Sequence, residues 1–328
     1  MNREMETPMN LKGIHHITAV SGKIQKNVNF YTNVLGMRLV KKSVNQDDVS
    51  AYHLFYADKN GTPGTDLTFF DWPHIGRNIP GADSISGTAL RVGSQEALEF
   101  WAERLSEHAV SPLLYAQPAG RDLLAFEDPE GQQLFLVNDR HAPMEGTIWP
   151  RPDIPESYAI KGLYSTVLTT PAADELIPVL SEILNFEVAT RGVWIDDHTP
   201  LIVFQTSKQG GPGAEIWLLN QPELNRGRLG AGGVHHTAFR VENGAQQRAW
   251  QERLRSLRLH VTKIIDRFWF RSIYFRVSSG ILFEIATEGP GFDIDEDPEK
   301  LGQKLVLPPF LENRREEIEA NLKSIQPS

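Results

Sequence analysis

The chain contains no cysteine among its 328 residues. This absence excludes disulfide bonds, a cysteine-ligated zinc site, an iron–sulfur cluster and a thiol nucleophile. Chemistry in this protein must therefore come from histidine, carboxylate, tyrosine or arginine side chains.

Long apolar runs and basic blocks are missing as well. No stretch approaches the roughly 18 apolar residues of a membrane-spanning helix, and the N-terminal residues MNREMETPMN lack the apolar centre of a signal peptide. Acidic residues (42) outnumber basic residues (33), the net charge is −9, and no run of five or six basic residues occurs. These features predict a cytoplasmic protein with neither a membrane nor a nucleic acid as its partner.

The sequence repeats itself with one fixed offset. Residues 12–13 (KG) recur at 161–162, and residues 89–92 (ALRV) recur as AFRV at 238–241, in both cases 149 positions later. A duplicated unit organises a whole fold, so the sequence predicts two similar halves.

Four prolines divide these halves. They lie between residues 141 and 158, and such a run cannot sustain a helix or a central strand, so this segment is expected to be a linker. The expected domains are an N-terminal domain over 1–140, the linker over 141–158, a C-terminal domain over 159–290, and a solvated acidic turn with a C-terminal helix over 291–328.

Each half is expected to divide again into two modules, in which a strand and a helix precede several strands. In the first module the pattern predicts a helix that ends at Gly36 and strands at 13–20, 37–44, 51–58 and 65–71. In the last module it predicts a helix at 244–258 and strands at 233–241, 261–265, 271–277 and 281–287. The fold class is therefore α+β, with four βαβββ modules.

Two His-His pairs and one strand glutamate stand out. The motif GIHHIT opens the first module with His15 and His16, GVHHTAF opens the last with His235 and His236, and ILFEI places Glu284 in its last strand. Neighbouring residues on a strand point to opposite faces, so each pair offers at most one ligand to a given site. Two imidazoles and one carboxylate suit Fe(II), Mn(II), Zn(II) or Ni(II) and leave coordination positions open. Hydrogen-bonded structural histidines and an outward-facing glutamate are the alternative interpretation.

These motifs, together with YHLFYAD and GTPGTDLTFF in the first module, resemble the glyoxalase/extradiol dioxygenase (vicinal oxygen chelate) superfamily. The similarity runs from about residue 11 to residue 310 and is strongest to the hydroquinone ring-cleaving dioxygenases, the group that includes 2,6-dichlorohydroquinone dioxygenase. The resemblance implies two tandem domains of this fold, one Fe(II) ion with Mn(II) as the alternative, and a small aromatic substrate that reacts with O2.

The resemblance also assigns the metal ligands. It places Fe(II) on His16, His236 and Glu284, the second histidine of each pair and the strand carboxylate. The positions related to these three by the 149-residue offset cannot hold a metal in the same way, since they are Ser165, Gly87 and Phe135. We therefore expect one site per chain, formed jointly by the first and fourth modules.

Four further residues receive roles from the same resemblance. Arg267 and Tyr274 are expected around the substrate, and His15 and His235 next to the metal ligands. All four are candidate catalytic residues, and His15, His235 or Tyr274 could supply or accept protons. The plainer interpretation makes Tyr274 a packing residue and Arg267 a solvent-exposed charge. The run RFWFR at 267–271 is strongly aromatic, which favours a larger or more apolar ring than hydroquinone.

The expected activity is Fe(II)-dependent, extradiol-type cleavage of a hydroquinone- or catechol-type ring by O2. One alternative is a glyoxalase-type metal-dependent isomerase or thiol transferase, which shares the module but uses no O2. Another is a metal-free protein that binds aromatic compounds. Strand edges and the expected helix over 311–325 also suggest a homodimer.

Overall fold

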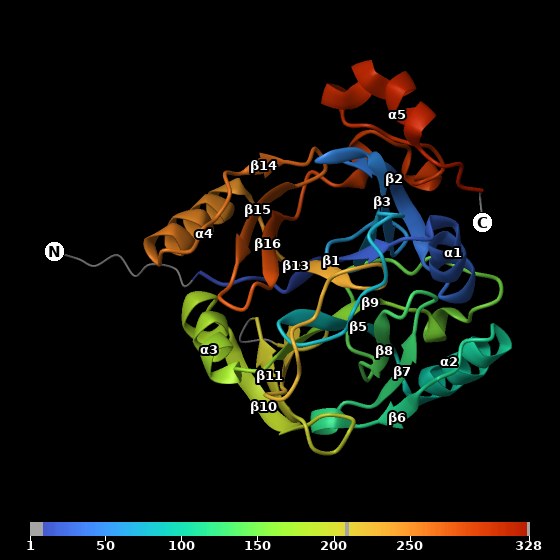
Figure 1. The fold of residues 1–328 in the computed structure, drawn as a ribbon. Coiled ribbons are helices and arrows are strands. Elements are labelled where there is room, and N and C mark those ends of the chain that lie inside the picture. Colours follow the sequence, from blue (N-terminus) through green and yellow to red (C-terminus); the bar gives the residue numbers. More distant parts are fainter. Residues whose placement is uncertain (1–8, 207–209, 327–328) are drawn as a thin grey trace.

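The computed structural model describes residues 9–206 and 210–326. Within them the chain folds as four modules, each containing a strand, a helix and three further strands (Figure 1). This confirms the predicted α+β fold. No helix in the described part of the chain is long and apolar enough to cross a membrane. The cytoplasmic location and the homodimer stay predictions.

The elements of the modules follow the same order. The first module comprises β1 (Ile14–Ser21), α1 (Ile24–Asn29), β2 (Arg38–Asn45), β3 (Asp48–Ala57) and β4 (Asp66–Asp71). The second comprises β5 (Ser84–Val92), α2 (Gln95–Glu107), β6 (Leu114–Ala116), β7 (Leu123–Glu127) and β8 (Gln133–Asn138). The third comprises β9 (Gly162–Thr170), α3 (Ala173–Pro178), β10 (Glu187–Val193), β11 (Pro200–Gln205) and β12 (Glu215–Asn220). The fourth comprises β13 (Val234–Val241), α4 (Gly244–Ser256), β14 (Ile265–Asp266), β15 (Arg271–Arg276) and β16 (Leu282–Thr287).

The first strands of the modules pair with one another, so that all strands belong to one sheet with two curved parts. β1 pairs antiparallel with β13, and β5 pairs antiparallel with β9. The first module therefore shares a curved sheet with the fourth, in the upper half of Figure 1, and the second shares one with the third below it. We call these sheets the 1–4 cup and the 2–3 cup. A single pair, Val234 with Ile85, connects the cups through β13 and β5.

Equivalent hydrogen bonds lock the two halves together. The N–H of Ile14 donates to the carbonyl of Gly213 at 2.8 Å, and the N–H of Leu163 donates to the carbonyl of Gly64 at 2.9 Å. Donors and acceptors are each related by the 149-residue offset. The φ angle is 98° at Gly64 and 83° at Gly213. A residue with a side chain would be strained in this conformation. The repeat seen in the sequence is thus a repeat of contacts.

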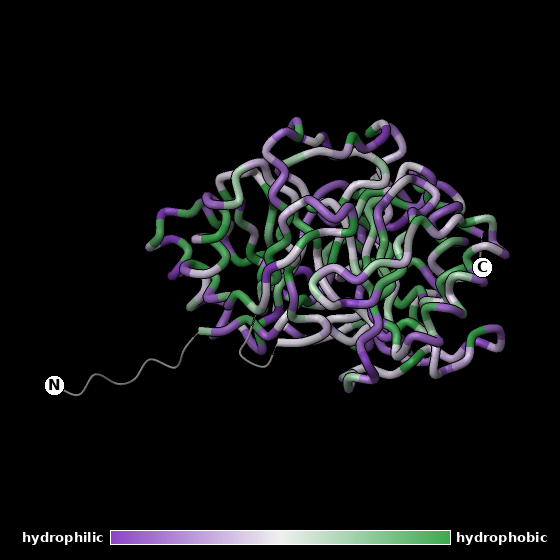
Figure 2. Tube along the Cα trace, turned by 90° about the horizontal axis from the view of Figure 1, so that it is seen from below, coloured by the Kyte–Doolittle hydropathy of each residue, from purple (hydrophilic) through white to green (hydrophobic). Residues whose placement is uncertain are grey.

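The cores lie between the sheets and the helices. In Figure 2 the hydrophobic segments concentrate inside the molecule and the hydrophilic ones at its outer turns. α2 begins after Ser94, whose side chain accepts a hydrogen bond from the N–H of Ala97, and its buried face includes Trp101. Trp250 takes the equivalent place on α4. The long amphipathic helices therefore cover one face of each half's sheet.

The proline-rich segment packs against the first half. Ile154 is 5% exposed, Arg104 of α2 contacts the carboxylate of Asp153 at 2.6 Å, and Trp101 Nε1 donates to the carbonyl of Tyr158 at 2.8 Å. These contacts anchor the segment along α2. The domain boundary within it stays a prediction.

Two predicted elements differ in length. The C-terminal helix α5 spans Arg315–Asn321 rather than 311–325, because a 3-10 turn over Pro309–Arg314 precedes it and Leu322 is extended. The strand expected at 261–265 is reduced to β14, with Val261 forming one isolated bridge. Ends of elements follow local capping and packing, which sequence periodicity does not record.

The acidic turn after β16 is less solvated than expected. Lys41 of β2 is fully buried, and its Nζ donates to the carbonyl of Phe292 at 2.9 Å and to the carboxylates of Asp295, at 2.8 Å, and Glu296. Trp269 completes the cluster, because its Nε1 donates to Asp295 at 3.0 Å. The turn thus neutralises a buried cation and fastens the C-terminal segment to the first module.

Replacing Lys41 by alanine should therefore destabilise the protein strongly. The change leaves two partly buried carboxylates without their cation, which costs about 3 kcal/mol of unfolding free energy. Lys59→Ala is the matched control, since Lys59 pairs with Glu299 of the same segment but both side chains are substantially exposed; it should cost less than about 1 kcal/mol. Chemical denaturation measures both, and equal losses would contradict the assigned role of Lys41.

Candidate metal centre

The sheet pairing of the 1–4 cup brings three predicted ligands together. His16 lies on β1, His236 on β13 and Glu284 on β16. Glu284 Oε2 lies 3.3 Å from His16 Nε2 and 3.0 Å from His236 Nε2, and the two Nε2 atoms are 3.4 Å apart. All three side chains are buried. They are the one group of this kind in residues 9–206 and 210–326.

This triangle has the dimensions of a cation site. Ligand atoms about 2.1 Å from a shared ion lie about 3.0 to 3.4 Å from one another. Glu284 Oε2 is buried without a hydrogen-bond partner in the described structure, while Oε1 accepts a hydrogen bond from the hydroxyl of Ser272. A buried carboxylate oxygen requires compensation. One divalent cation fits the donor set and satisfies this oxygen.

The protonation states suit a cation too. Burial alone would raise the pKa of Glu284, but His16 and His236 hold this pKa well below its usual range. Burial lowers the pKa of His236, and Glu284 offsets part of that effect. An ionised carboxylate and neutral imidazoles are the forms that bind metals.

Each pair contributes one histidine to the cluster, and the neighbouring histidine contacts it through its ring instead of pointing away from it. His15 Nδ1 lies 2.9 Å from His16 Nδ1, and His235 Nδ1 lies 2.7 Å from His236 Nδ1. The β1–β13 register shifts between Ile14 and His16 and again opposite His235. Each first histidine thus occupies a bulge, and a bulge re-aims its side chain.

These contacts fix the orientation of the imidazoles. An Nε2 that binds a metal carries no proton, so with a metal bound the ring proton of His16 would lie on Nδ1 and be donated to His15 Nδ1. His15 Nε2 then donates to the carbonyl of Thr287 at 3.1 Å. His235 accepts from His236 in the same way. Burial, followed by the adjacent histidine, lowers the pKa of both His15 and His235 to about 3, so both stay neutral.

Arg267 and Tyr274 also lie at the site. Tyr274 is paired with Glu284 across β15 and β16, and its ring lies 5.7 Å from that of His236. The guanidinium of Arg267 lies 5.5 Å from the centre of the Tyr274 ring and donates to Asp47 at 2.7 Å. The Arg267 side chain is only 14% exposed, so it is not a solvated charge. Burial and Glu284 raise the pKa of Tyr274, which keeps the phenol protonated.

His53 of β3 is a site residue that the sequence interpretation missed. Its Nε2 lies 3.0 Å from Thr68 Oγ1, and burial, followed by the nearby His16 and His236, lowers its pKa well below the usual range. Its motif, YHLFYAD, contributed to the resemblance without a role for the histidine. Unlike His16 and His236, His53 does not belong to a His-His pair, so the sequence gives no signal that it lies at the site.

Aromatic side chains surround the cluster. The ring of Phe270 lies 5.2 Å from His15 and 5.3 Å from His16, and Trp72 lies 5.6 Å from His235. Phe70 stacks on Trp72 at 5.2 Å. The walls of the site are therefore largely apolar rings, which pack favourably against a flat aromatic ligand.

The equivalent place in the 2–3 cup is filled. Gly87 corresponds to His236, and a Cβ at this position would lie 2.6 Å from the ring of Phe135, the counterpart of Glu284. Trp194 packs on Phe135 with ring centres 5.3 Å apart, and on Trp217 at 5.8 Å. Packed rings occupy the volume that a ligand set would need.

The comparisons with known proteins agree with this geometry. Residues 13–135 match the glyoxalase/bleomycin resistance protein/dioxygenase superfamily. A Bacillus subtilis protein that carries the name ring-cleaving dioxygenase MhqA is 44% identical over 97% of this chain and 100% of its own length. The chain belongs to this superfamily. A chlorohydroquinone/hydroquinone 1,2-dioxygenase of Sphingobium indicum is 30% identical over 96% of this chain and 97% of that relative.

Solved structures of this superfamily extend the likeness. A dioxygenase from Bacillus subtilis has a TM-score of 0.89 at 36% identity, covering 97% of this chain and 99% of its own. Glyoxalase I from Zea mays has a TM-score of 0.61 at 12% identity, covering 84% and 92%. The first supports membership of the superfamily. The second shows the shared fold alone.

Removing any one of the three clustered side chains should abolish stoichiometric metal binding. His16→Ala, His236→Ala and Glu284→Ala each leave two donors. We expect the affinity of each variant for Fe(II) or Mn(II) to fall at least about 100-fold. His198→Ala is the control, because that side chain is 80% exposed. Metal content after anaerobic dialysis measures the effect. Full metal content in all three variants would rule out this site.

Proposed function

We propose that this protein is an Fe(II)-dependent, extradiol-type dioxygenase that cleaves a hydroquinone- or catechol-type ring with O2. Mn(II) is the alternative metal. The buried triangle of His16, His236 and Glu284 carries the proposal. The names of the relatives, which include a hydroquinone 1,2-dioxygenase, support the choice of substrate class.

The bound ion would favour the ionised form of a ring hydroxyl and hold the ring close to O2. His15 and His235 keep the ligand imidazoles turned with Nε2 towards Glu284. Their low pKa values mean that they do so as neutral hydrogen-bond acceptors at Nδ1. This orientation is the part of the chemistry that the buried His-His contacts provide.

Tyr274 and His53 provide hydrogen bonds to the ring oxygens. The pKa of His53 is held well below its usual range, so this side chain stays neutral; if its Nε2 donates to Thr68, its Nδ1 can accept a hydrogen bond from a ring hydroxyl. The protonated phenol of Tyr274 can donate to a ring oxygen. Arg267 lies over the Tyr274 ring and is held by Asp47, which fixes the tyrosine against the cluster.

The two alternative functions explain less of the site. A metal-free binding protein has no need for two imidazoles and a carboxylate that converge on one buried point. A glyoxalase-type isomerase or thiol transferase shares the fold, but the likeness to the maize enzyme, at 12% identity, bears on architecture alone. The ring-cleaving assignment accounts for both the donor set and the aromatic walls.

Oxygen uptake tests the proposal. Protein purified anaerobically and reconstituted with Fe(II) should consume O2 with hydroquinone, methylhydroquinone or catechol, and His236→Ala should lower the rate more than about 100-fold because the metal is lost. His198→Ala should behave as the parent protein. Absence of uptake with every ring, despite one bound metal per chain, would favour the glyoxalase-type alternative.

A further inference from the structure

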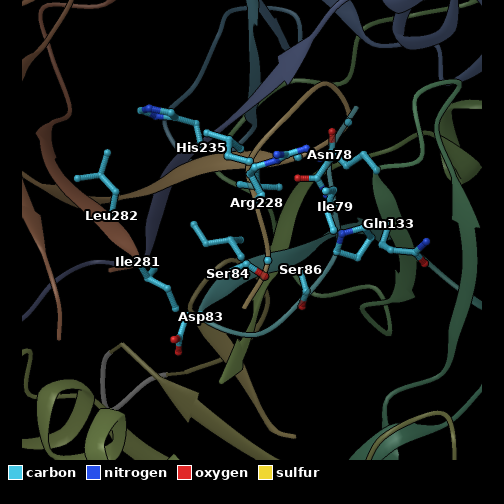
Figure 3. A pocket seen from close by; sticks show the side chains of 18 of the residues that line it. Asn78, Ile79, Asp83, Ser84, Ser86, Gln133, Arg228, His235, Ile281 and Leu282 are labelled. Atoms are coloured by element: carbon cyan, nitrogen blue, oxygen red, sulfur yellow. The ribbon is translucent and has the colours of Figure 1, made fainter. Parts of the chain in front are cut away.

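A cavity of about 140 Å³ with a mixed polar and apolar lining lies where the two cups meet. β5 contributes Ser84 and Ser86, and the ends of β13, β15 and β16 contribute His235, Arg276 and Leu282. Figure 3 shows its labelled lining, with Ile281 and Leu282 on one side, Asn78, Ile79 and Gln133 on the other, and Ser84 and Ser86 between them. None of these residues has a role in the proposed ring chemistry except His235.

The cavity adjoins the metal centre. His235 lines it and contacts His236 through their Nδ1 atoms. Arg276 and Leu282 are paired across β15 and β16, two residues along from the pair Tyr274 and Glu284. Residues two apart on a strand share a face and lie about 7 Å from each other. The cavity therefore lies within the length of a short ring substituent from the cluster.

The lining carries positive charge. Arg228 and Arg276 both border the cavity, and neither forms an ion pair with any residue that the structure describes. Arg276 Nη1 donates to the carbonyl of Gly280 at 2.7 Å, which leaves its other donors available. The one lining carboxylate, Asp83, accepts a hydrogen bond from Thr170 at 3.2 Å. In a chain of net charge −9, two such arginines mark a place for an anion.

We propose that this cavity binds a carboxylate group carried by the aromatic substrate, with Arg276 and Arg228 as the residues that select it. The inference rests on the proposed function, because it requires the ring to lie at the metal cluster. Guanidinium groups bind carboxylates with charge-assisted hydrogen bonds. Whole-ligand pockets usually measure about 300 Å³ or more, so a cavity of about 140 Å³ fits a short acidic side chain rather than a second ring.

The test compares a neutral and an anionic ring. Hydroquinone and 2,5-dihydroxyphenylacetate are offered to the Fe(II)-loaded protein, and kcat/KM is measured for each. We expect the acidic ring to be preferred, and Arg276→Gln and Arg228→Gln to reduce the ratio of the two kcat/KM values at least about tenfold. Arg276→Lys should retain part of the preference. Arg271→Gln, which changes an exposed arginine at the other end of β15, should leave the ratio as it is.

A second arm measures binding without turnover. Calorimetric titration of the metal-free protein with 2,5-dihydroxyphenylacetate should give a dissociation constant that Arg276→Gln raises at least about tenfold and that increases with salt. Hydroquinone turnover without preference for the acidic ring, or equal effects of the arginine variants on both rings, would overturn this inference and leave the proposed function standing. Turnover of neither ring would overturn the proposed function, and the titration would then decide on the cavity by itself.

Discussion

The antiparallel pairing of β1 with β13 is the contact on which the candidate site depends. It joins the first module to the fourth across more than 200 residues of chain, and it sets His16 beside His236. β16 then lies parallel to β13 and brings in Glu284. Because strands in a sheet are about 4.8 Å apart, three side chains from neighbouring strands can meet within one ion's reach. The sheet, and not a loop, holds the ligands.

Burial gives this arrangement its chemical character and its cost. Glu284 is fully buried, and His16 and His236 hold its pKa well below the usual range. An uncompensated buried carboxylate costs several kcal/mol, so a bound cation would contribute to the stability of the fold as well as to chemistry. The His-His contacts serve the same end, since each satisfies a ring nitrogen that has no access to water.

The sequence predicts the modules well because the 149-residue repeat and the strand periodicity can be recognised along the chain without knowledge of tertiary contacts. The resemblance identifies the clustered residues, and the structure places His16, His236 and Glu284 together. The bulges at His15 and His235 could not be predicted, because alternation of side chains holds only in a regular ladder. The burial of Lys41 against Asp295 and Glu296 could not be predicted either, since these charges are about 250 residues apart and each alone is typical of a surface.

The filled 2–3 cup shows how a duplicated architecture can divide its tasks. A residue larger than glycine at position 87 would collide with the ring of Phe135. A carboxylate at position 135 would find no imidazole at position 87. Restoring one lost donor alone would therefore gain nothing, which makes the specialisation hard to reverse by single substitutions. Each half of the duplication contributes one module to each cup, so one cup keeps the set of three ligands while the other is filled by packed aromatic rings.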